Sequence, residues 1–537
     1  MGLAITPSIS TVSEQPIEAK GTINRILLVF PATIKLDELS IVSEKHERAQ
    51  KSEDVAGVEY PLIKINNYIF NRSEITNFSI DCTEFLPKIT LSVILASQLF
   101  IAKEMPKDGD IVSVAIRNRT DALKIIRNDY VITGVHTVSN LTEVKAPVAM
   151  TFYGELFIPG LKSQKNDFSF KGTTLDAAKD FAKKFGLGFA SNEDNTSDKQ
   201  IWLKANIAGD IYINNIVERA WRDTKSFYKC WIDLYYNLNF INLDKQLMSA
   251  ETETDIAAVI SNLDKNWNYG TNAEDVETSL TVKVFSNYQS FRTSSFYITS
   301  WRPFNRSSNI TFQMGTKMTC EMFEHNKNIY ENPKTEKNKH YWAVTVEPTY
   351  DKDKVNKTIL LRGRATMVKD EKNPDLQRAN YSYVDLYEKF PWLGTQYTIS
   401  NPDDDNLQWD GNHHKNYQVA KVQNLINNKE LDKLNLHVEV NGNNFNIIRA
   451  DKIPVVLVKT DAVDNMKINP DSNFNDMLDL FYSGWYLVKG FTLNWTGKNK
   501  GSIISNFSQE FILTRREWPA PLPVEPVPLT ETATINK

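Results

Sequence analysis

The stretch Tyr130-Val131-Ile132-Thr133-Gly134-Val135 recurs near the other end of the chain as Tyr486-Leu487-Val488-Lys489-Gly490-Phe491. Both copies are rich in β-branched and aromatic residues, which is typical of strands. Two further blocks recur in the same order: Ile111 to Ile116 as Ile453 to Val458, and Phe152 with Glu155 to Ile158 as Phe507 with Glu510 to Leu513. Short blocks repeated in one order indicate a duplicated structural unit.

The spacing of the blocks supports this duplication. Gly134 and Phe152 are 18 positions apart, and Gly490 and Phe507 are 17 apart. The first two blocks are 19 positions apart in one copy and 33 in the other, which predicts a loop insertion around 461–481. We therefore expect two similar β-barrels, with a chance match of strand-like blocks as the alternative.

The repeat predicts a framework of equivalent residues in the two barrels. Glycine inside a strand favours a bulge or a tight bend. The two glutamates fit the solvent-facing positions of alternating strands better than a catalytic role. The framework consists of Tyr130, Gly134, Phe152 and Glu155 in the first barrel and Tyr486, Gly490, Phe507 and Glu510 in the second.

Composition narrows the class of protein. A chain of 537 residues exceeds the size of a single core, so we expect two to four domains. The net charge of -4 argues against a tight nucleic-acid binder, which usually carries a basic excess. The three cysteines, Cys82, Cys230 and Cys320, are far apart and indicate neither a disulfide framework nor a zinc site. Synthesis in a reducing cytoplasm fits best.

The sequence predicts no stable association with membranes. Its longest apolar runs, such as Ile26 to Phe30 and Ile453 to Val458, have the length of strands. A membrane-spanning helix needs about 20 apolar residues. The N-terminus also lacks the basic and apolar regions of a signal peptide.

An α+β unit interrupts the strands. Thr173 and Asp176 form a capping box, and apolar residues follow at helical spacing up to Gly186, which suits the left-handed position after a helix. A second helix follows Asp210. Residues 227–242 are predicted to form one long strand or a hairpin. A further helix is expected at about 416–428, and Asn441-Gly442 is typical of a hairpin turn.

These patterns divide the chain into six parts. The fold class is mainly β with an α+β insert, and it contains two similar β-barrel domains. The expected parts are a flexible N-terminal arm (1–23), a first β-barrel (24–165), an α+β domain (166–285), an intermediate β-rich region that partly contributes to the second barrel (286–433), a second β-barrel (434–518) and a Pro-rich tail (519–537). Three chains around an axis would present six similar units, so a trimer becomes pseudo-hexameric.

The sequence contains no phosphate-binding glycine loop, no nucleophile elbow and no paired-histidine metalloprotease helix. His413 and His414 lie near Asp403, Asp404, Asp405 and Asp410. Adjacent histidines project in different directions and a loop of aspartates is usually solvated, so we favour a loop without metal over a metal site. We expect no enzyme activity, no cofactor and no metal; a pair of glycosidase carboxylates is the catalytic alternative.

Aromatic residues cluster after the second predicted helix. Packing in the core or at an interface is the commoner use of such residues, and we favour it over a stacking platform for sugars or bases. The possible interface residues are Trp221, Phe227, Tyr228, Trp231, Tyr235 and Tyr236. The tail from Trp518 to Pro528 is predicted to be extended polyproline-like chain, either a linker or a docking peptide.

Three motifs of this α+β unit resemble those of baseplate hub proteins of tailed phages, a family related to the spike-base proteins of type VI secretion. They are Lys183-Lys184-Phe185-Gly186-Leu187-Gly188-Phe189-Ala190-Ser191-Asn192, Ser226-Phe227-Tyr228 and Tyr235-Tyr236-Asn237-Leu238-Asn239-Phe240. The ending Thr514-Arg515-Arg516-Glu517-Trp518-Pro519 resembles the close of that family's second barrel. The likeness covers most of 24–519 and is weakest between 250 and 430.

The resemblance implies a homotrimeric torus between a hexameric tail tube and a trimeric central spike, in contact with other baseplate proteins. DNA would pass through its lumen only in transit, during ejection into the host. The protein would belong to the virion tail or baseplate and assemble in the host cytoplasm. Because 19 residues follow Trp518, we expect no fused lysozyme or peptidase domain.

Two alternatives remain open. The chain could be the spike-base protein of a type VI or tailocin-like contractile injection system, which shares the architecture. It could also be a carbohydrate-binding or cell-wall hydrolase tail protein.

Overall fold

The structure is a computed structural model, which describes residues 24–26, 61–66, 68–95, 100, 105–107, 109–116, 126–139, 147–163, 167–247, 285–287, 297–305, 318–323, 341–350, 356–359, 364–370, 373–382, 387–389, 392–400, 414, 416–431, 434–445, 447–459, 479, 482–497 and 507–515. The expected arm, the Pro-rich tail, most of the predicted insertion around 461–481, and His413 with its four aspartates lie outside these residues.

A 13-stranded sheet is the main body of the described chain. Its N-terminal half has the order β4 (Ile75–Asp81), β5 (Lys88–Leu95), β8 (Val148–Leu156), β7 (Ile126–Ser139), β6 (Ile111–Ile116), β2 (Leu62–Ile65) and β3 (Tyr68–Ile69). Along β5 every second side chain is buried, namely Ile89, Leu91, Val93 and Leu95. One face of this half therefore packs into the core, as the alternation predicts.

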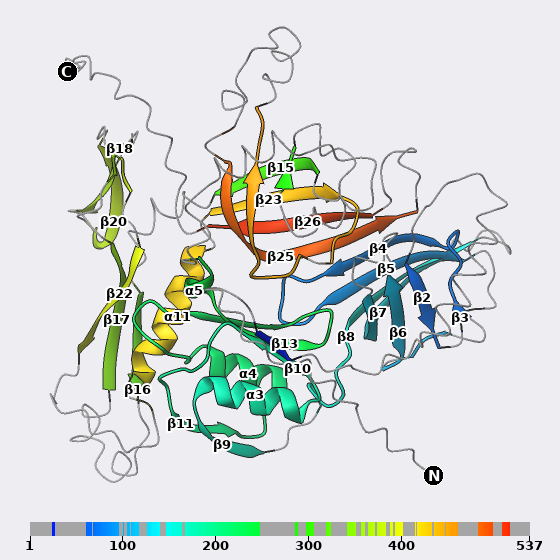
Figure 1. Cartoon of the computed structure of the whole chain (residues 1–537), viewed down its shortest axis with the longest axis horizontal. Helices are drawn as coiled ribbons and strands as arrows, with labels where there is room; N and C mark the ends of the chain where they lie inside the picture. The colour runs from blue at the N-terminus through cyan, green and yellow to red at the C-terminus, as the bar shows by residue number, and fades with distance from the viewer. Residues whose placement is uncertain are drawn as a thin grey trace, which may run out of the picture.

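The C-terminal half of the sheet repeats this order. It runs β15 (Ile298–Asn305), β23 (Leu434–Asn441), β26 (Phe507–Thr514), β25 (Gly484–Thr496), β24 (Lys452–Val456) and β14 (Phe285–Ser286). Each described neighbour pair is antiparallel except β14 and β24. The two halves meet at β25 and β4, where the orange and blue strands of Figure 1 adjoin. The predicted fold class, mainly β with an α+β insert and two similar β units, is confirmed, and both units share one curled sheet.

Strand register corrects the match of the first repeated block. Tyr130 pairs with Val112, and Tyr486 pairs with Ile453. Val112 is therefore the equivalent of Ile453, one residue later than the sequence comparison places it. Short apolar strands match at several offsets, and only the pairing partner fixes the register.

The third block is displaced further. The buried Phe152 pairs with Val135, and the buried Phe511 pairs with Phe491. Phe511 is thus the equivalent of Phe152, and the sequence match of Phe152 with Phe507 is wrong by four positions. By the same register Glu510 corresponds to Thr151 rather than to Glu155.

The repeated glycines follow a bulge in both halves. The pairing of β7 with β8 shifts between Ile132 and Gly134, and the pairing of β25 with β26 shifts between Val488 and Gly490. The interpretation of these glycines as bulge residues is confirmed. A bulge adds twist and bends the strand, which favours the curl of each half.

The α+β unit lies against one side of the sheet (Figure 1). It comprises β9 (Phe168–Gly172), α3 (Thr174–Lys184), β10 (Gly188–Ser191), β11 (Gln200–Lys204), α4 (Gly209–Val217), β12 (Tyr228–Ile232), β13 (Asn237–Asn242) and α5 (Leu243–Leu247). A four-stranded sheet has the order β1 (Asn24–Ile26), β10, β13 and β12, and β9 pairs with β11. Residues 227–242 thus form a hairpin rather than one long strand.

The ends of α3 follow the predicted signals. Thr173 Oγ1 accepts a hydrogen bond from the Asp176 amide at 3.2 Å, and the Asp176 carboxylate accepts from the Thr173 amide at 3.4 Å. At the other end Gly186 has a φ of 66°. The Leu187 amide donates to the Ala182 carbonyl at 2.8 Å, which closes the helix in a Schellman motif. Both predicted caps are confirmed.

The remaining strands lie at the left of Figure 1, where β16 (Met318–Phe323) and β17 (Tyr341–Tyr350) contact α11 (Tyr417–Leu431). They form three small sheets: β16, β17 and β22 (Trp392–Ser400); β18 (Asn356–Ile359) and β21 (Tyr387–Lys389); β19 (Arg364–Asp370) and β20 (Asn373–Ser382). The helix expected at about 416–428 is confirmed as α11.

The predicted hairpin at Asn441-Gly442 is wrong. Gly442 has the expected positive φ of 88°, so the chain turns there. The next strand, β24, pairs with β25 and β14 instead of folding back on β23. The edges of β23 are already occupied by β15 and β26, so tertiary pairing overrides the local hairpin signal.

Candidate functional site

The two β units are joined by a continuous strand pairing. β25 and β4 run antiparallel from Thr492 opposite Asp81 to Thr496 opposite Asn77. Trp495 faces Phe78 across this pairing, and both side chains are fully buried. Separating the units would break main-chain hydrogen bonds and expose aromatic core, so the units form one rigid body.

Gly490 lies where the first unit comes nearest to β25. A Cβ at this position would lie 2.9 Å from the Cα of Thr83 and 3.2 Å from the Cys82 carbonyl oxygen. The Cys82 amide donates to the Phe491 carbonyl at 2.9 Å beside it. The bulge glycine thus allows two backbones to touch. At its counterpart Gly134 the nearest atom, Cδ2 of Tyr153, is 3.6 Å away.

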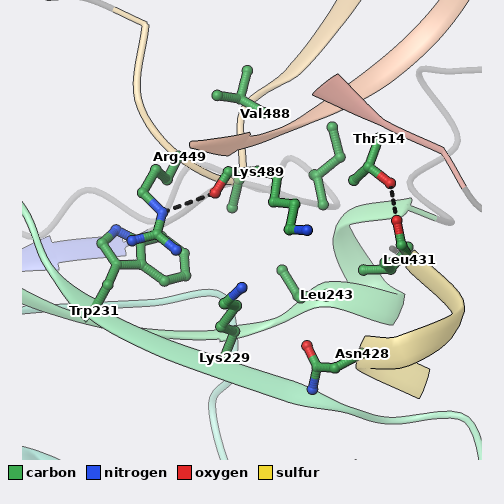
Figure 2. A pocket seen from close by; sticks show the side chains of 11 residues that line it. Lys229, Trp231, Leu243, Asn428, Leu431, Arg449, Val488, Lys489 and Thr514 are labelled. Carbon is green, nitrogen blue, oxygen red and sulfur yellow. Dashed lines mark hydrogen bonds between the residues drawn. The ribbon is translucent and has the colours of Figure 1, made fainter. Parts of the chain in front are cut away.

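Arg449 connects three parts of the chain. Its Nε donates to the Lys489 carbonyl of β25 at 2.9 Å, and its Nη1 donates to the Glu84 carbonyl of the β4–β5 loop at 2.5 Å. Its guanidinium lies 4.6 Å from the centre of the Trp231 ring on β12 (Figure 2). Arg449 is 4% exposed, and its burial lowers its pKa to about 10. The planar guanidinium therefore ties both β units to the α+β unit.

A small pocket lies beside Arg449. Its walls come from β12, α5, α11, β25 and β26 and include Lys229, Leu243, Asn428, Lys489 and Thr514 (Figure 2). Its volume of about 20 Å³ has room for one or two water molecules. A substrate pocket is larger by an order of magnitude. This pocket belongs to a structural junction.

The α+β unit is also hydrogen-bonded to the first β unit. Asn128 Nδ2 donates to the Leu234 carbonyl at 2.8 Å, and the Asp129 amide donates to the Tyr236 hydroxyl at 3.0 Å. Asn128, Asp129 and Tyr236 are buried. Buried polar groups with well-placed partners fix one packing arrangement, so the insert keeps one orientation relative to the sheet.

Helix α11 docks on the α+β unit through side-chain amides. Asn424 Oδ1 accepts from the Tyr228 amide at 2.8 Å, and its Nδ2 donates to the Ala220 carbonyl at 2.8 Å. Gln423 Nε2 donates to the Ser226 carbonyl at 2.7 Å. Because both side chains are buried, these bonds fix the helix in register against the end of α4 and the start of β12.

Two acidic residues are buried within the α+β unit. Asp198 accepts from the Thr174 and Trp221 amides at 2.8 Å each, and burial raises its pKa against the opposing effect of these donors. Glu193 is bound by Arg222 Nη1 at 2.8 Å. Neither carboxylate is more than 7% exposed. Both serve as acceptors for neighbouring protein groups and are inaccessible to a substrate.

The aromatic residues predicted to lie at an interface are largely in the core. Tyr235 is half-buried. The others, Trp221, Phe227, Tyr228, Trp231 and Tyr236, are at most 4% exposed. The interface interpretation is therefore corrected for these five residues, because their side chains are covered by the same chain. Burial also excludes them as a stacking platform for sugars or bases.

The framework residues occupy different environments. Tyr130, Phe152, Tyr486 and Phe507 are buried, whereas Glu155 and Glu510 are only partly covered. Glu155 forms an ion pair with Lys162. Glu510 accepts from Arg302 at 2.9 Å and lies 3.2 Å from His437 Nδ1. The junction around Arg449 escaped the sequence analysis, because its members are far apart in the sequence and carry no motif.

The face of the sheet opposite the core carries a polar row across both units. Directly paired residues share one face of a sheet. The row runs Ser300, Glu439, Glu510, Thr492, Asp81, Lys88 and Glu155, and each member is half-buried or exposed. A continuous polar face of this kind borders water rather than a second protein core.

The described residues contain no group of three or more His, Cys, Asp or Glu side chains able to hold a metal. His414 is buried, and its amide donates to Gln200 Oε1 at 3.3 Å. Among the same residues no helix is both long and apolar enough to cross a bilayer.

Sequence comparisons find neither a matching family model nor a matching curated protein. The chain is similar in structure to phage-type tail proteins. A tail protein from Neisseria meningitidis aligns at 10% identity over 86% of this chain and 97% of its own, with a TM-score of 0.40. The 43 kDa tail protein of prophage MuSo2 from Shewanella oneidensis aligns at 10% identity over 85% and 98%, with a TM-score of 0.42.

A component of the Escherichia coli type VI secretion system aligns at 7% identity over 86% of this chain and 79% of its own, with a TM-score of 0.35. By their names, the first two neighbours are tail proteins and the third is a type VI secretion component.

Proposed function

We propose that the chain is a structural, non-catalytic hub of a phage-type baseplate, which adapts a hexameric tail tube to a trimeric central spike as a homotrimer. The observation that carries this proposal is the repeated strand order in the two halves of one sheet. Three such chains around an axis present six similar units while retaining three-fold symmetry. One face of the ring would match a six-fold partner and the other a three-fold partner.

Rigidity supports the adaptor role. An adaptor transmits the position of one partner to another, so its units must not move independently. The pairing of β25 with β4, the guanidinium of Arg449 and the amides of α11 hold the two β units and the α+β unit in one arrangement.

The polar row supports a water-filled passage for DNA in transit. It contains four carboxylates, Glu439, Glu510, Asp81 and Glu155, and one lysine, Lys88. A surface that holds DNA neutralises phosphates with Lys and Arg. A passage lined by this row would let DNA slide without binding it.

The absence of catalysis is part of the proposal. The buried carboxylates Asp198 and Glu193 are bound to neighbouring groups, and the pocket at Arg449 admits only one or two waters. Turnover of peptidoglycan by the purified chain, abolished by a single carboxylate substitution, would favour a cell-wall hydrolase instead. The spike base of a contractile injection system would share the geometry, and the neighbouring genes distinguish it from a phage hub.

The first test is solution mass. Light scattering on the purified chain should give about three times the 61.5 kDa of the monomer. Electron microscopy of the same sample should show a ring with six similar outer lobes. A strict monomer, in the presence of tube and spike proteins as well as alone, would contradict the hub proposal.

A further inference from the structure

The pairing that joins the two β units uses one edge strand of each unit. In the second unit this strand is β25, which pairs with β24 near its start and with β4 of the first unit near its end. Its equivalent in the first unit is β7, which pairs with β6 from Ile126 to Val131. Beyond Val131 no described strand pairs with β7 on the side away from β8. The first unit therefore repeats this edge without a partner for it within the described chain.

The other edge of the pairing is repeated as well. β4 is separated from β8 by β5, and β15 is separated from β26 by β23, so β15 is the equivalent of β4. The paired residues place Trp301 at the position of Phe78 and Pro303 at the position of Ile80. The register shift at the start of β4 recurs at the start of β15. β15 lies at one end of the sheet (Figure 1), and β23 is its one partner among the described strands.

Positions that are buried in the pairing of β25 with β4 are exposed at these two edges. Leu493 and Ile80 face each other in that pairing, and both are 0% exposed. Their equivalents, Thr137 on β7 and Pro303 on β15, are both exposed. The two edges thus match a pairing that the chain already makes, and exposed strand edges are templates for pairing with another chain.

We propose that β7 of one copy of this chain pairs with β15 of the next copy, in the register that joins β25 to β4. Thr137 then lies opposite Pro303, as Leu493 lies opposite Ile80. The contact is head-to-tail, and three such contacts close a ring in which pairings within and between chains alternate. This inference rests on the proposed homotrimer and names the strands that form it.

Main-chain hydrogen bonds hold such a pairing together. Within the chain the Cys82 amide donates to the Phe491 carbonyl of β25 at 2.9 Å. Alternate residues of a strand direct their amides to the same side, so the Ile80 amide also faces β25. Pro303 has no amide hydrogen at the equivalent position, which is tolerated at a strand edge. The pairing between copies therefore has one donor fewer than the pairing within the chain and is expected to be weaker.

A disulfide between copies tests the register. Residues of a hydrogen-bonded antiparallel pair have Cα atoms about 5.5 Å apart, which suits a disulfide. In a Cys320→Ser background, Thr137→Cys combined with Pro303→Cys should give covalent trimers of the full chain on a non-reducing gel. Thr137→Cys combined with Arg302→Cys is the control. Arg302 is exposed but points to the opposite face from Pro303, so this pair should give monomers on the gel.

A charged side chain tests burial at the same contact. Thr137→Lys places an ammonium group at the equivalent of the buried Leu493, and it should raise the concentration at which the trimer dissociates by at least about tenfold. His136→Lys is the matched control. His136 is exposed, and its equivalent, Thr492, belongs to the polar row, so this variant should assemble like the unmodified chain. Because Thr137 is exposed in the single chain, the far-UV circular dichroism of both variants should be unchanged.

The outcomes separate this inference from the hub proposal. The inference is overturned by a trimer that does not cross-link through Thr137→Cys with Pro303→Cys, that cross-links equally through the control pair, or that withstands Thr137→Lys. Each of these results leaves the hub proposal standing. A chain that stays monomeric even with tube and spike proteins overturns both.

Discussion

A Cβ on Gly490 would lie 2.9 Å from the Cα of Thr83. The two residues belong to different β units, and their backbones touch where the units join. At the equivalent bulge of the other unit, a Cβ on Gly134 would make only an ordinary van der Waals contact, 3.6 Å from Cδ2 of Tyr153. The repeat thus contains its own control for the importance of this contact.

Gly490→Ala should destabilise the fold by about 3 kcal/mol, because the backbone of the first unit cannot yield without opening the pairing of β25 with β4. Gly134→Ala should cost less than about 1 kcal/mol. Urea denaturation followed by tryptophan fluorescence measures both. Equal losses of unfolding free energy in the two variants would show that the close approach of Gly490 to Thr83 does not contribute to the stability of the pairing between β25 and β4.

Arg449→Met should destabilise the fold by about 3 kcal/mol. The change leaves the Lys489 and Glu84 carbonyls without their donor and removes the stacking on Trp231. The control is Arg302→Met, whose side chain is 73% exposed and pairs with Glu510, so its loss should stay below about 1 kcal/mol. Thermal melts of the two variants measure the difference. An unchanged melting temperature in Arg449→Met would contradict the claim that Arg449 stabilises the packing of the β units against the α+β unit.

Neighbouring residues of α11 test how this helix is docked. Asn424→Ala removes bonds to the Tyr228 amide and the Ala220 carbonyl and should cost about 2 kcal/mol, since buried groups lose their partners. Leu425 is 39% exposed, and Leu425→Ala should change stability by less than about 1 kcal/mol. Hydrogen exchange of the Tyr228 amide should accelerate only in Asn424→Ala.

Cys82 and Cys230 should be unreactive in the folded chain. Both thiols are buried, and burial raises the pKa of each well above the usual range, so little thiolate forms. In a Cys320→Ser variant, which leaves these two thiols, labelling by a disulfide reagent should follow global unfolding in urea. Fast labelling without denaturant would show local opening, either of the pairing between β4 and β25 next to Cys82 or of the α+β unit at Cys230.

The sequence predicted those features of secondary structure that depend on residues close together in the chain. The capping box at Thr173 and the left-handed Gly186 marked the ends of α3, since a helix terminus is satisfied within one turn. The alternation in β5 located its buried face. The aromatic cluster around Trp231 was recognised, but whether it faced a partner or the core depended on packing from α11 and the loop at Arg449.

The sequence by itself determined the strand-rich class, the helical insert, the duplication and the bulge at Gly134 and Gly490, because each is carried by residue type and short spacing. Three relationships were decided only by the tertiary structure. Phe511 rather than Phe507 is the equivalent of Phe152, β24 pairs with β25, and the guanidinium of Arg449 stacks on the ring of Trp231. These relations join segments tens to hundreds of residues apart. Their register is set by which partner offers a matching edge or cavity, and no local pattern encodes that choice.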